Sequence, residues 1–238
     1  PGSALKPFIY ALGLEQGVLH PLTILKDVPS TFGSYAPENF DLRFMGPLPA
    51  TQALNYSRNI PAVDIAAKLS KPNLYQFLRL AGLSGMAGEK HYGLSLVLGG
   101  GEVTAQELAK LYAILANRGV LRPLRMTESE QPAAPVRLLS EEAAFITLDM
   151  LGQHRRPGNT LAQKPMTLPV YWKTGTSWGF RDAWSSGITG PYVLVVWLGN
   201  FDGTGNSALI GAEAAAPLFF NIIDNIMAEY PALREPDF

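Results

Sequence analysis

Apolar positions recur with a helical period along most of this chain of 238 residues. From Ser3 to about Gln16 they fall three and four residues apart, which predicts a helix. The same spacing over 51–69 predicts two helices, because Pro61 favours the first turn of a new helix and the preceding one would end near Tyr56. Further helices are predicted over 71–81, 104–117, 140–151 and 217–230.

The pattern changes to strands toward the end of the chain. Segments 170–176, 182–188 and 192–198 are short and apolar, and Gly190-Pro191 provides a turn between the last two. Their close spacing predicts an antiparallel meander. Since helices dominate the middle of the chain and strands its end, the predicted fold class is α+β, with an antiparallel sheet flanked by helices.

Three segments carry little periodicity and are predicted as loops: 20–50, 122–137 and 153–169. The first of them holds five prolines and is long for a loop within a compact domain. Loops of this length often line a functional site, because binding and catalytic side chains are commonly carried by loops that a rigid scaffold of helices and strands positions.

Composition narrows the classes of function. The apolar share is 47% and the charged share 16%, enough for a sizeable core in one large domain or two small ones. A net charge of −1 gives no indication of a nucleic-acid partner. The absence of cysteine excludes disulfides, thiolate metal sites and cysteine catalysis, and the three histidines lack the spacing of metal ligands. We therefore expect no cofactor and no metal.

The two ends of the chain bear on its context. No apolar run approaches the length of a membrane span, and no signal-peptide pattern opens the chain. The first residues begin abruptly at a predicted helix, so we expect the chain to be a fragment of a longer protein.

The first candidate for chemistry is the run Ser3-Ala-Leu-Lys6. On a helix, both polar side chains lie on one face, one turn apart. A serine hydroxyl needs a neighbouring base to become a nucleophile, and a lysine can be that base when burial, a nearby positive charge and the positive helix end lower its pKa. Taken alone, the pattern is more often an ordinary helix start with a serine cap and a chance lysine.

Two more short motifs follow in order. Ser57-Arg-Asn59 lies in the turn between two predicted helices, and Lys173-Thr174-Gly175 lies on a predicted strand. Each alone has an ordinary structural interpretation, the first as capping of exposed N–H groups and the second as a strand end. Together, in this order and each in its expected context, the three motifs resemble those of penicillin-binding proteins and serine β-lactamases.

The surrounding sequence narrows the resemblance to the transpeptidase domain of class A penicillin-binding proteins. It is carried by the stretches 35–41, 46–63, 98–109 and 173–184. The last of these, with Gly199-Asn-Phe-Asp-Gly203, is most similar to the 1C type within that family. The resemblance implies a β-lactamase/transpeptidase-like fold that lacks its N-terminal strands. Residues 1–238 would then be a truncated transpeptidase domain, without the glycosyltransferase domain and membrane anchor of the family.

The resemblance also implies a reaction, which is acyl transfer on the D-Ala-D-Ala end of a peptidoglycan stem peptide. Ser3 would attack the penultimate carbonyl with Lys6 as its base. Ser57 would relay a proton to the leaving amine, and Asn59 would hold Lys6 and the substrate amide. Lys173 would supply the positive charge for the substrate carboxylate. An amine of a second stem peptide would then take the acyl group from Ser3 and form the cross-link.

The same resemblance assigns the substrate-binding residues. Thr174 and Thr176 would donate hydroxyl hydrogen bonds, and Gly175 would let the peptide backbone lie close to the strand. The oxyanion hole would be formed by the backbone N–H groups of Ser3 and Thr176. Aromatic residues that follow the third motif are more often part of a core than ligand contacts, and Trp178 is the best candidate among them for substrate contact.

The implied partners are peptidoglycan stem peptides and β-lactam antibiotics, which would acylate Ser3. The full-length parent would be anchored at the periplasmic face of the bacterial inner membrane. A chain without the missing strands would expose an unpaired sheet edge near 192–198. We expect this edge to pair with another chain or to leave the fragment marginally stable.

Two alternatives remain open at this point. The first is a hydrolase on the same fold, either a β-lactamase or a D,D-carboxypeptidase. A class A β-lactamase needs a glutamate that activates water, but Glu141 and Glu142 open a predicted helix and no convincing loop glutamate lies between the second and third motifs. The second is a non-catalytic β-lactam sensor, which needs the same acylation residues as a slow enzyme. The 1C likeness favours the transpeptidase.

Overall fold

The computed structural model describes residues 1–131, 133–157, 168–231 and 233. Its α-helices are α1 (Lys6–Glu15), α2 (Ala50–Asn55), α3 (Asn59–Lys68), α4 (Leu74–Leu80), α5 (Glu89–Tyr92), α6 (Ala105–Ala116), α7 (Glu141–Gly152) and α8 (Ala216–Glu229). Its strands are β1 (Ile24–Asp27), β2 (Gly46–Pro49), β3 (Val120–Leu121), β4 (Val136–Arg137), β5 (Tyr171–Thr176), β6 (Asp182–Thr189) and β7 (Tyr192–Gly199). Shorter turns of helix are η1 (Gly2–Leu5), η2 (Gly93–Leu98), η3 (Trp178–Phe180) and the π-helical η4 (Gly211–Ala215).

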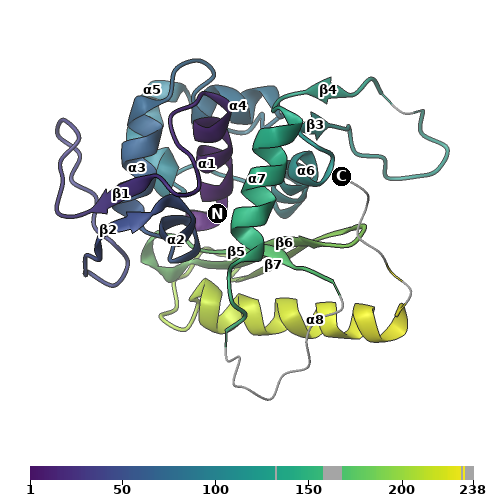
Figure 1. Cartoon of the computed structure of the whole chain (residues 1–238). Coiled ribbons are helices and arrows are strands. Elements are labelled where there is room, and N and C mark those ends of the chain that lie inside the picture. Colours follow the sequence, from purple (N-terminus) through teal and green to yellow (C-terminus); the bar gives the residue numbers. More distant parts are fainter. Residues whose placement is uncertain (132, 158–167, 232, 234–238) are drawn as a thin grey trace.

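A three-stranded antiparallel sheet, in the order β5-β6-β7, divides the molecule into two layers. Helix α8 covers one face of the sheet, and α1, α6 and α7 lie on the other (Figure 1). This arrangement confirms the predicted α+β class and the antiparallel meander. Within the described residues, β7 pairs only with β6, so its outer edge has no strand partner. Whether another chain pairs there stays a prediction.

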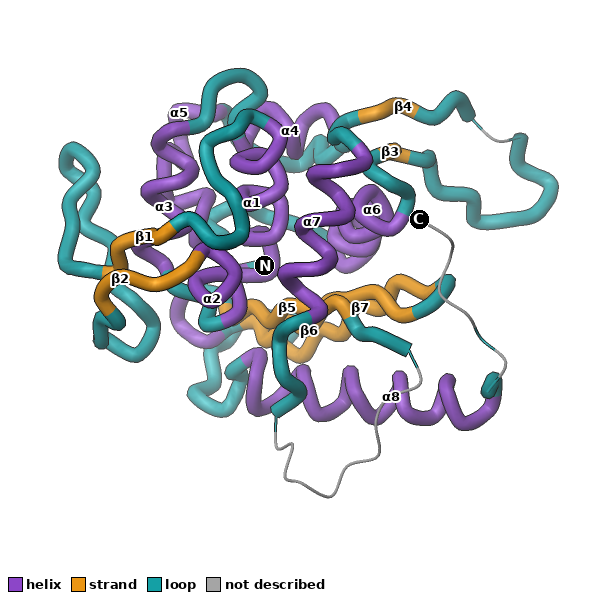
Figure 2. Tube along the Cα trace, in the orientation of Figure 1, coloured by secondary structure: helices purple, strands orange, loops and turns teal. Residues whose placement is uncertain are grey.

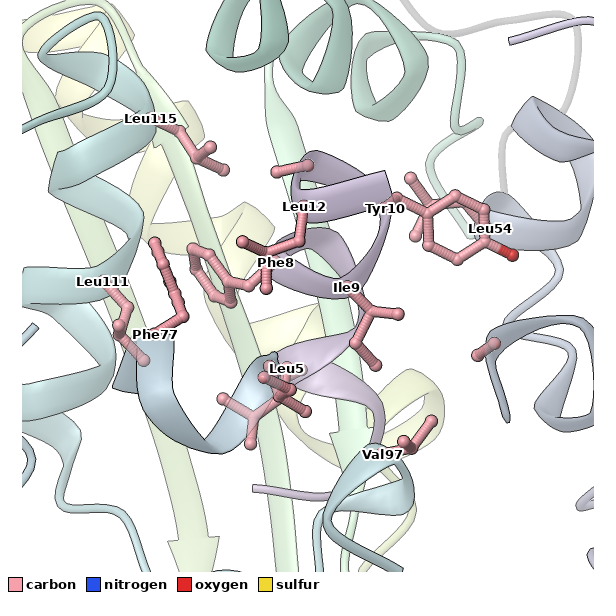
Figure 3. Close-up of a cluster of buried hydrophobic side chains, with 14 of the residues drawn as sticks. Leu5, Phe8, Ile9, Tyr10, Leu12, Leu54, Phe77, Val97, Leu111 and Leu115 are labelled. Carbon is pink, nitrogen blue, oxygen red and sulfur yellow. The ribbon is translucent and has the colours of Figure 1, made fainter. Parts of the chain in front are cut away.

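Helix α1 is the centre of the larger layer, and its residues from Lys6 to Gly13 are all buried. The ring of Phe8 stacks on Phe77 of α4 and meets Tyr112 of α6 edge-on, with centroids 6.0 and 5.4 Å apart. Figure 3 shows Phe8, Ile9 and Leu12 of this segment, with Leu5 of η1 just before it, among side chains from α2, α4 and α6. Burying each large apolar side chain contributes about 1.5–3 kcal/mol, so α1 is held firmly.

The opposite layer rests on a second apolar cluster. Phe219, Phe220 and Ile223 of α8 are buried against the sheet, where they meet Trp172 of β5 and Val196 of β7. The indole of Trp172 lies edge-on to the ring of Phe220 with centroids 4.9 Å apart. Trp172, which precedes Lys173, is therefore held in place by its packing against α8. This packing fixes the direction of β5.

Most predicted elements are confirmed, with small shifts at their ends. Helix α6 has the clearest sequence signal, because the Thr104 hydroxyl accepts from the Glu107 N–H and the Glu107 carboxylate accepts from the Thr104 N–H. The segment 20–50, predicted as mostly loop, instead holds β1 and β2, which form a two-stranded ribbon beside α2 and α3 (Figure 2). Part of the predicted loop 153–169, residues 158–167, lies outside the described residues.

Candidate active site

The first residues of the chain are packed between the sheet and the helical layer. The turn η1 carries Ser3 and leads directly into α1, which begins at Lys6. The backbones of η1 and β5 are so close that a Cβ on Gly175 would lie 1.9 Å from the Pro1 carbonyl oxygen. The Tyr112 hydroxyl also donates to the Ala4 carbonyl at 3.0 Å. Ser3 is thereby held against β5, where it lines a cleft.

Lys6 is fully buried, and its ammonium group has three oxygen partners. Its Nζ donates to the Ser57 carbonyl and to Asn59 Oδ1 at 2.6 Å each, and to Ser57 Oγ at 3.4 Å. Among the residues that the structure describes, the Ser3 hydroxyl makes no side-chain hydrogen bond. A neutral Lys6 keeps two N–H groups, enough for the two short bonds, and has a lone pair left for a proton from Ser3.

Lys173, like Lys6, reaches the Ser57 hydroxyl. It is fully buried on β5, and its Nζ donates to Ser57 Oγ at 2.9 Å and to the Thr174 carbonyl at 3.2 Å. The Ser57 hydroxyl therefore lies between Lys6 and Lys173. A hydroxyl can accept from one nitrogen and donate to another, so it can pass a proton between them.

Burial sets the protonation of both lysines. It lowers the pKa of Lys6 well below its ordinary value, and the charges of Lys173 and Arg58 lower that pKa further. Burial also lowers the pKa of Lys173 to about 7. Both shifts favour the neutral amine, which is the form of Lys6 that can accept a proton.

The turn between α2 and α3 presents Ser57 and Asn59 to the cleft. Ser57 has a φ of +57°, a left-handed conformation that is uncommon outside glycine, asparagine and aspartate. Arg58 pairs with Asp27 of β1, with Nε and Oδ2 2.7 Å apart. The Asn59 N–H donates to Asn39 Oδ1 at 2.8 Å. The segment 20–50 thus contributes to the site, as its length suggested.

The cleft has a volume of about 400 Å³ and follows the outer edge of β5, which has no strand partner in the described part of the chain. An extended peptide could pair with such an edge. Gly211 donates its N–H to the Thr176 hydroxyl at 2.9 Å, which leaves the hydroxyl proton of Thr176 free for a ligand. The predicted site residues that line the cleft are Ser3, Ser57, Asn59, Lys173, Thr174, Gly175 and Thr176.

Trp178 is not among the residues that line this cleft. Its side chain is 87% exposed, and the Arg181 guanidinium lies over its ring at 5.9 Å. The neighbouring Phe180 meets Phe40 of the β1–β2 loop, with ring centroids 5.9 Å apart, and Phe40 does line the cleft. Trp184 is buried in the core. Substrate contact by Trp178 therefore stays a prediction.

Sequence reasoning did not single out several residues that the structure brings to the site. His154 lines the cleft, and its ring stacks on Trp172 with centroids 4.2 Å apart. Its pKa is lowered to about 4 by burial and by the Lys173 charge. Glu213 of η4 also lines the cleft, and its carboxylate has no ion-pair partner among the described residues. A lone histidine and a lone glutamate carry no spacing signal that would have identified them.

In the described ranges, no three or more His, Cys, Asp or Glu side chains are grouped to hold an ion. None of the helices in those ranges combines the length and apolar character that crossing a membrane requires. What the cleft does hold is Ser3, the Ser57 hydroxyl and the buried Lys173, and the buried Lys6 donates to Ser57 from behind it. This set can support nucleophilic attack by Ser3 on a carbonyl carbon.

Comparison with known proteins gives a family match over most of the chain. The family described as "Penicillin binding protein transpeptidase domain" matches residues 1–199. The chain is 38% identical over 232 residues to penicillin-binding protein 1C of Escherichia coli strain K12, covering 95% of this chain and 29% of that protein. The chain thus spans less than a third of the length of that relative.

Solved structures share the fold. The crystal structure of penicillin-binding protein 1A from Haemophilus influenzae aligns with a TM-score of 0.81 at 22% identity, covering all of this chain and 43% of that one. PonA1 of Mycobacterium tuberculosis in complex with penicillin V aligns with a TM-score of 0.78 at 20% identity, covering all of this chain and 70% of that one. At these identities the likeness shows the fold.

Proposed function

The chain belongs to the penicillin-binding protein transpeptidase domain family, and from this premise we propose that it is a serine D,D-transpeptidase that cross-links peptidoglycan stem peptides. The observation that carries the proposal is the Ser57 hydroxyl between two buried lysines, in the cleft that Ser3 lines. A bridging hydroxyl of this kind suits a reaction in which a proton is transferred from the attacking nucleophile to the amine that leaves.

The first half of the proposed reaction forms an acyl-enzyme. The Ser3 hydroxyl attacks the carbonyl of the penultimate D-Ala and passes its proton to neutral Lys6. The bond to the terminal D-Ala breaks, and its amine takes a proton through Ser57. Backbone N–H groups of Ser3 and Thr176 stabilise the oxyanion, each contributing on the order of 3 kcal/mol to the transition state.

The second half transfers the acyl group. The amine of a neighbouring stem peptide attacks the ester carbon, gives its proton back through the same groups and releases Ser3 as the free hydroxyl. The substrate carboxylate is held by the positive charge of Lys173 with the hydroxyls of Thr174 and Thr176. Asn59 accepts from Lys6 and donates to the substrate amide. These roles restore the enzyme after each cross-link.

A β-lactam would follow the first half of this path and stop. Its ring amide resembles the D-Ala-D-Ala amide, and opening the ring leaves an ester on Ser3. We also propose that residues 1–238 form one transpeptidase domain, because Phe219, Phe220 and Ile223 of α8 belong to the buried cluster that holds Trp172 of β5. In the full-length protein this domain would face the periplasm from an anchor in the inner membrane.

The deciding experiment is intact mass spectrometry after incubation with benzylpenicillin, beside the variant Ser3→Ala. We expect a stable mass increase of one penicillin that is absent in Ser3→Ala. Transpeptidation of stem-peptide donors then separates the enzyme from a β-lactam sensor, because a sensor is acylated without forming cross-links. No adduct on a folded wild-type protein, with penicillin left intact, would refute the proposal.

The hydrolase alternative has a specific residue to test. Glu141 of α7 pairs with Arg118 at 3.2 Å, and neither Glu141 nor Glu142 lines the cleft. Glu213 does line the cleft, and a carboxylate there could activate water for deacylation. Rapid turnover of penicillin that is lost in Glu213→Gln would favour the hydrolase. A lasting adduct in both proteins would favour the transpeptidase.

Trp178 has its own test in the peptide reaction. Because its ring is almost fully exposed, Trp178→Ala should leave the melting temperature unchanged. If the ring contacts substrate beyond the cleft, the variant raises KM for a stem-peptide donor several-fold and leaves kcat alone. An unchanged KM would show that Trp178 is a surface residue only.

A further inference from the structure

A buried ion pair lies directly behind the turn that carries Ser57 and Asn59. Arg58 Nε and Asp27 Oδ2 are 2.7 Å apart, with side chains that are 7% and 0% exposed. The second nitrogen of the guanidinium, Nη1, reaches Asp41 Oδ2 at 3.0 Å. The third, Nη2, donates to the Arg43 carbonyl. Each nitrogen of the Arg58 guanidinium is therefore tied to the end of β1 or to the loop between β1 and β2.

Asp27 is the anchor of this arrangement. Its Oδ1 accepts from Asn39 Nδ2 at 2.7 Å, and its Oδ2 accepts from the Met45 N–H at 2.9 Å as well as from Arg58. The other end of the Asn39 amide, Oδ1, accepts from the Asn59 N–H at 2.8 Å. A continuous set of hydrogen bonds thus runs from Asp27 to the two residues after Ser57, directly to Arg58 and through Asn39 to Asn59.

Stability alone does not account for a buried ion pair. Removing two charges from water costs several kcal/mol for each ion, and apolar residues of similar volume are often as stabilising. The turn itself is strained, since Ser57 has a φ of +57°, and such strain persists only where surrounding contacts fix the backbone. Part of this fixing comes from Asp27, Asn39 and Arg58, which hold the two residues after Ser57, beside the bond from Lys6 Nζ to the Ser57 carbonyl.

We propose that Asp27, Arg58 and Asn39 form a positioning unit of the acyl-transfer site, which holds Ser57 and Asn59 in reach of Lys6 and Lys173. The inference rests on the proposed function and adds to it residues that act through Ser57 and Asn59. Without this unit the turn relaxes, and the distances from Lys6 to the Ser57 carbonyl and to Asn59 Oδ1, both 2.6 Å, lengthen.

The unit also has an electrostatic signature, because its two charges act on Lys6 with opposite sign. The charged groups that face Lys6 are Lys173 on β5, Arg58 before α3 and Asp27 on β1. Beyond the effect of burial, Lys173 and Arg58 lower the pKa of Lys6, and Asp27 raises it. Losing the Arg58 charge should therefore raise the pKa of Lys6, and losing the Asp27 charge should lower it.

The test measures the second-order rate constant of acylation by benzylpenicillin against pH, with thermal unfolding beside it. The variants are Asp27→Asn, Arg58→Gln, Arg58→Lys and the double variant Asp27→Asn/Arg58→Gln. The matched control is Asp64→Asn, which breaks the exposed Asp64–Lys68 pair on α3 and touches no residue of the unit. All rates are taken at temperatures where each protein is folded.

We expect the maximal rate to fall by about 10- to 100-fold in the three single variants. The acid limb of the profile should move to lower pH in Asp27→Asn and to higher pH in Arg58→Gln, by about half a pH unit or more. In Arg58→Lys, which keeps the charge, the limb should stay at its wild-type position. In the double variant the limb should lie between those of Asp27→Asn and Arg58→Gln, with the maximal rate still reduced. Asp64→Asn should match the wild type.

Other results would overturn the inference. If Asp27→Asn and Arg58→Gln lose only thermal stability, and their acylation rates and acid limbs match the wild type, the pair is structural. Should the single variants fail to fold, the uncharged double variant decides, and a wild-type maximal rate in it rejects the positioning role. A folded wild type that forms no adduct refutes the proposed function, and the inference falls with it.

Discussion

Lys6 and Lys173 direct their side-chain nitrogens at the same oxygen, because Ser57 Oγ lies 3.4 Å from one and 2.9 Å from the other. Two ammonium groups this close in a buried site repel each other, so the pair loses a proton more readily than either lysine alone. The geometry thus makes a neutral lysine available as a base. It also makes the titration of each lysine depend on the other.

The first prediction concerns the pH profile of acylation. The rate constant for benzylpenicillin should rise with pH as Lys6 loses its proton, since only the neutral amine can accept one from Ser3. In Lys173→Gln the neighbouring charge is gone, so the pKa of Lys6 should rise and the acid limb should move to higher pH by about one unit. Rates measured from about pH 5 to about pH 10 would locate the limb.

The maximal rate of Lys173→Gln is not diagnostic, because the variant also loses the charge that holds the substrate carboxylate. The informative quantity is the pH at which the acid limb of the acylation profile lies. A limb that stays in place or moves to lower pH would contradict the electrostatic coupling of the two lysines.

The second prediction separates function from stability at Ser57. Because Ser57 has a left-handed backbone, Ser57→Gly should leave the free energy of unfolding unchanged or raise it by up to about 1 kcal/mol. The same variant loses the bridging hydroxyl, so acylation should fall by about 100-fold or more. Denaturant unfolding and intact-mass kinetics would give the two values.

A matched control is Leu42→Gly. Leu42 has a φ of +57° and a side chain that is 69% exposed. Leu42→Gly should relax backbone strain in the same way and leave acylation near the wild-type rate. If Ser57→Gly retained wild-type acylation, Ser57 could not be the proton relay.

The sequence predicts the elements with strong local patterns and misses those that depend on distant partners. Helix α6 and the β5-β6-β7 meander follow from periodicity and capping alone. Strand β2 contains Pro47 and Pro49, which argue against a strand. It forms because a two-stranded ribbon has an outer edge where a missing N–H does no harm.

The residues of the site divide in the same way, into those that a local sequence pattern identifies and those that depend on distant partners. Short motifs identify Ser3, Ser57 and Lys173, because their spacing along the chain reflects the elements that carry them. Asp27 has no such signal: it lies 31 residues before Arg58, and only the tertiary fold brings the two together. Arg58 stood inside a motif, yet nothing local indicates that its side chain forms a buried pair with Asp27.

The third prediction uses the close contact between η1 and β5. A Cβ on Gly175 would lie 1.9 Å from the Pro1 carbonyl oxygen and 3.0 Å from the Ala4 nitrogen. Gly175→Ala must therefore push η1 away from the strand and displace Ser3. We expect a loss of about 1–3 kcal/mol of unfolding free energy and a fall in acylation of about 100-fold.

The matched control for this variant is Gly85→Ala. A Cβ on Gly85 would meet no atom within 4 Å, so stability and acylation should stay at or near their wild-type values. Wild-type acylation in Gly175→Ala would show that Ser3 does not depend on this contact for its position.

The fourth prediction follows from the cost of keeping Lys173 buried. Its pKa falls from the ordinary value of 10.5 to about 7 in the folded protein. Between these two values the unfolded chain binds more protons than the folded one, so Lys173 makes stability rise with pH from about 7 to about 10. Below pH 7 the lysine is charged in both states, and the folded protein carries the full penalty of burying that charge.

Lys173→Met removes the penalty and keeps the volume of the side chain. The variant should be more stable than the wild type near pH 6, by on the order of a few kcal/mol, and the difference should shrink toward pH 10. Thermal unfolding across this range would measure it, with Lys68→Met, which replaces a side chain that is 58% exposed, as the control that changes little. A Lys173→Met protein that is less stable at every pH would show that the hydrogen bonds to Ser57 Oγ and the Thr174 carbonyl outweigh desolvation. A Lys173→Met protein that is more stable than the wild type would mean that the site keeps Lys173 for its chemistry, although burying it lowers the stability of the fold.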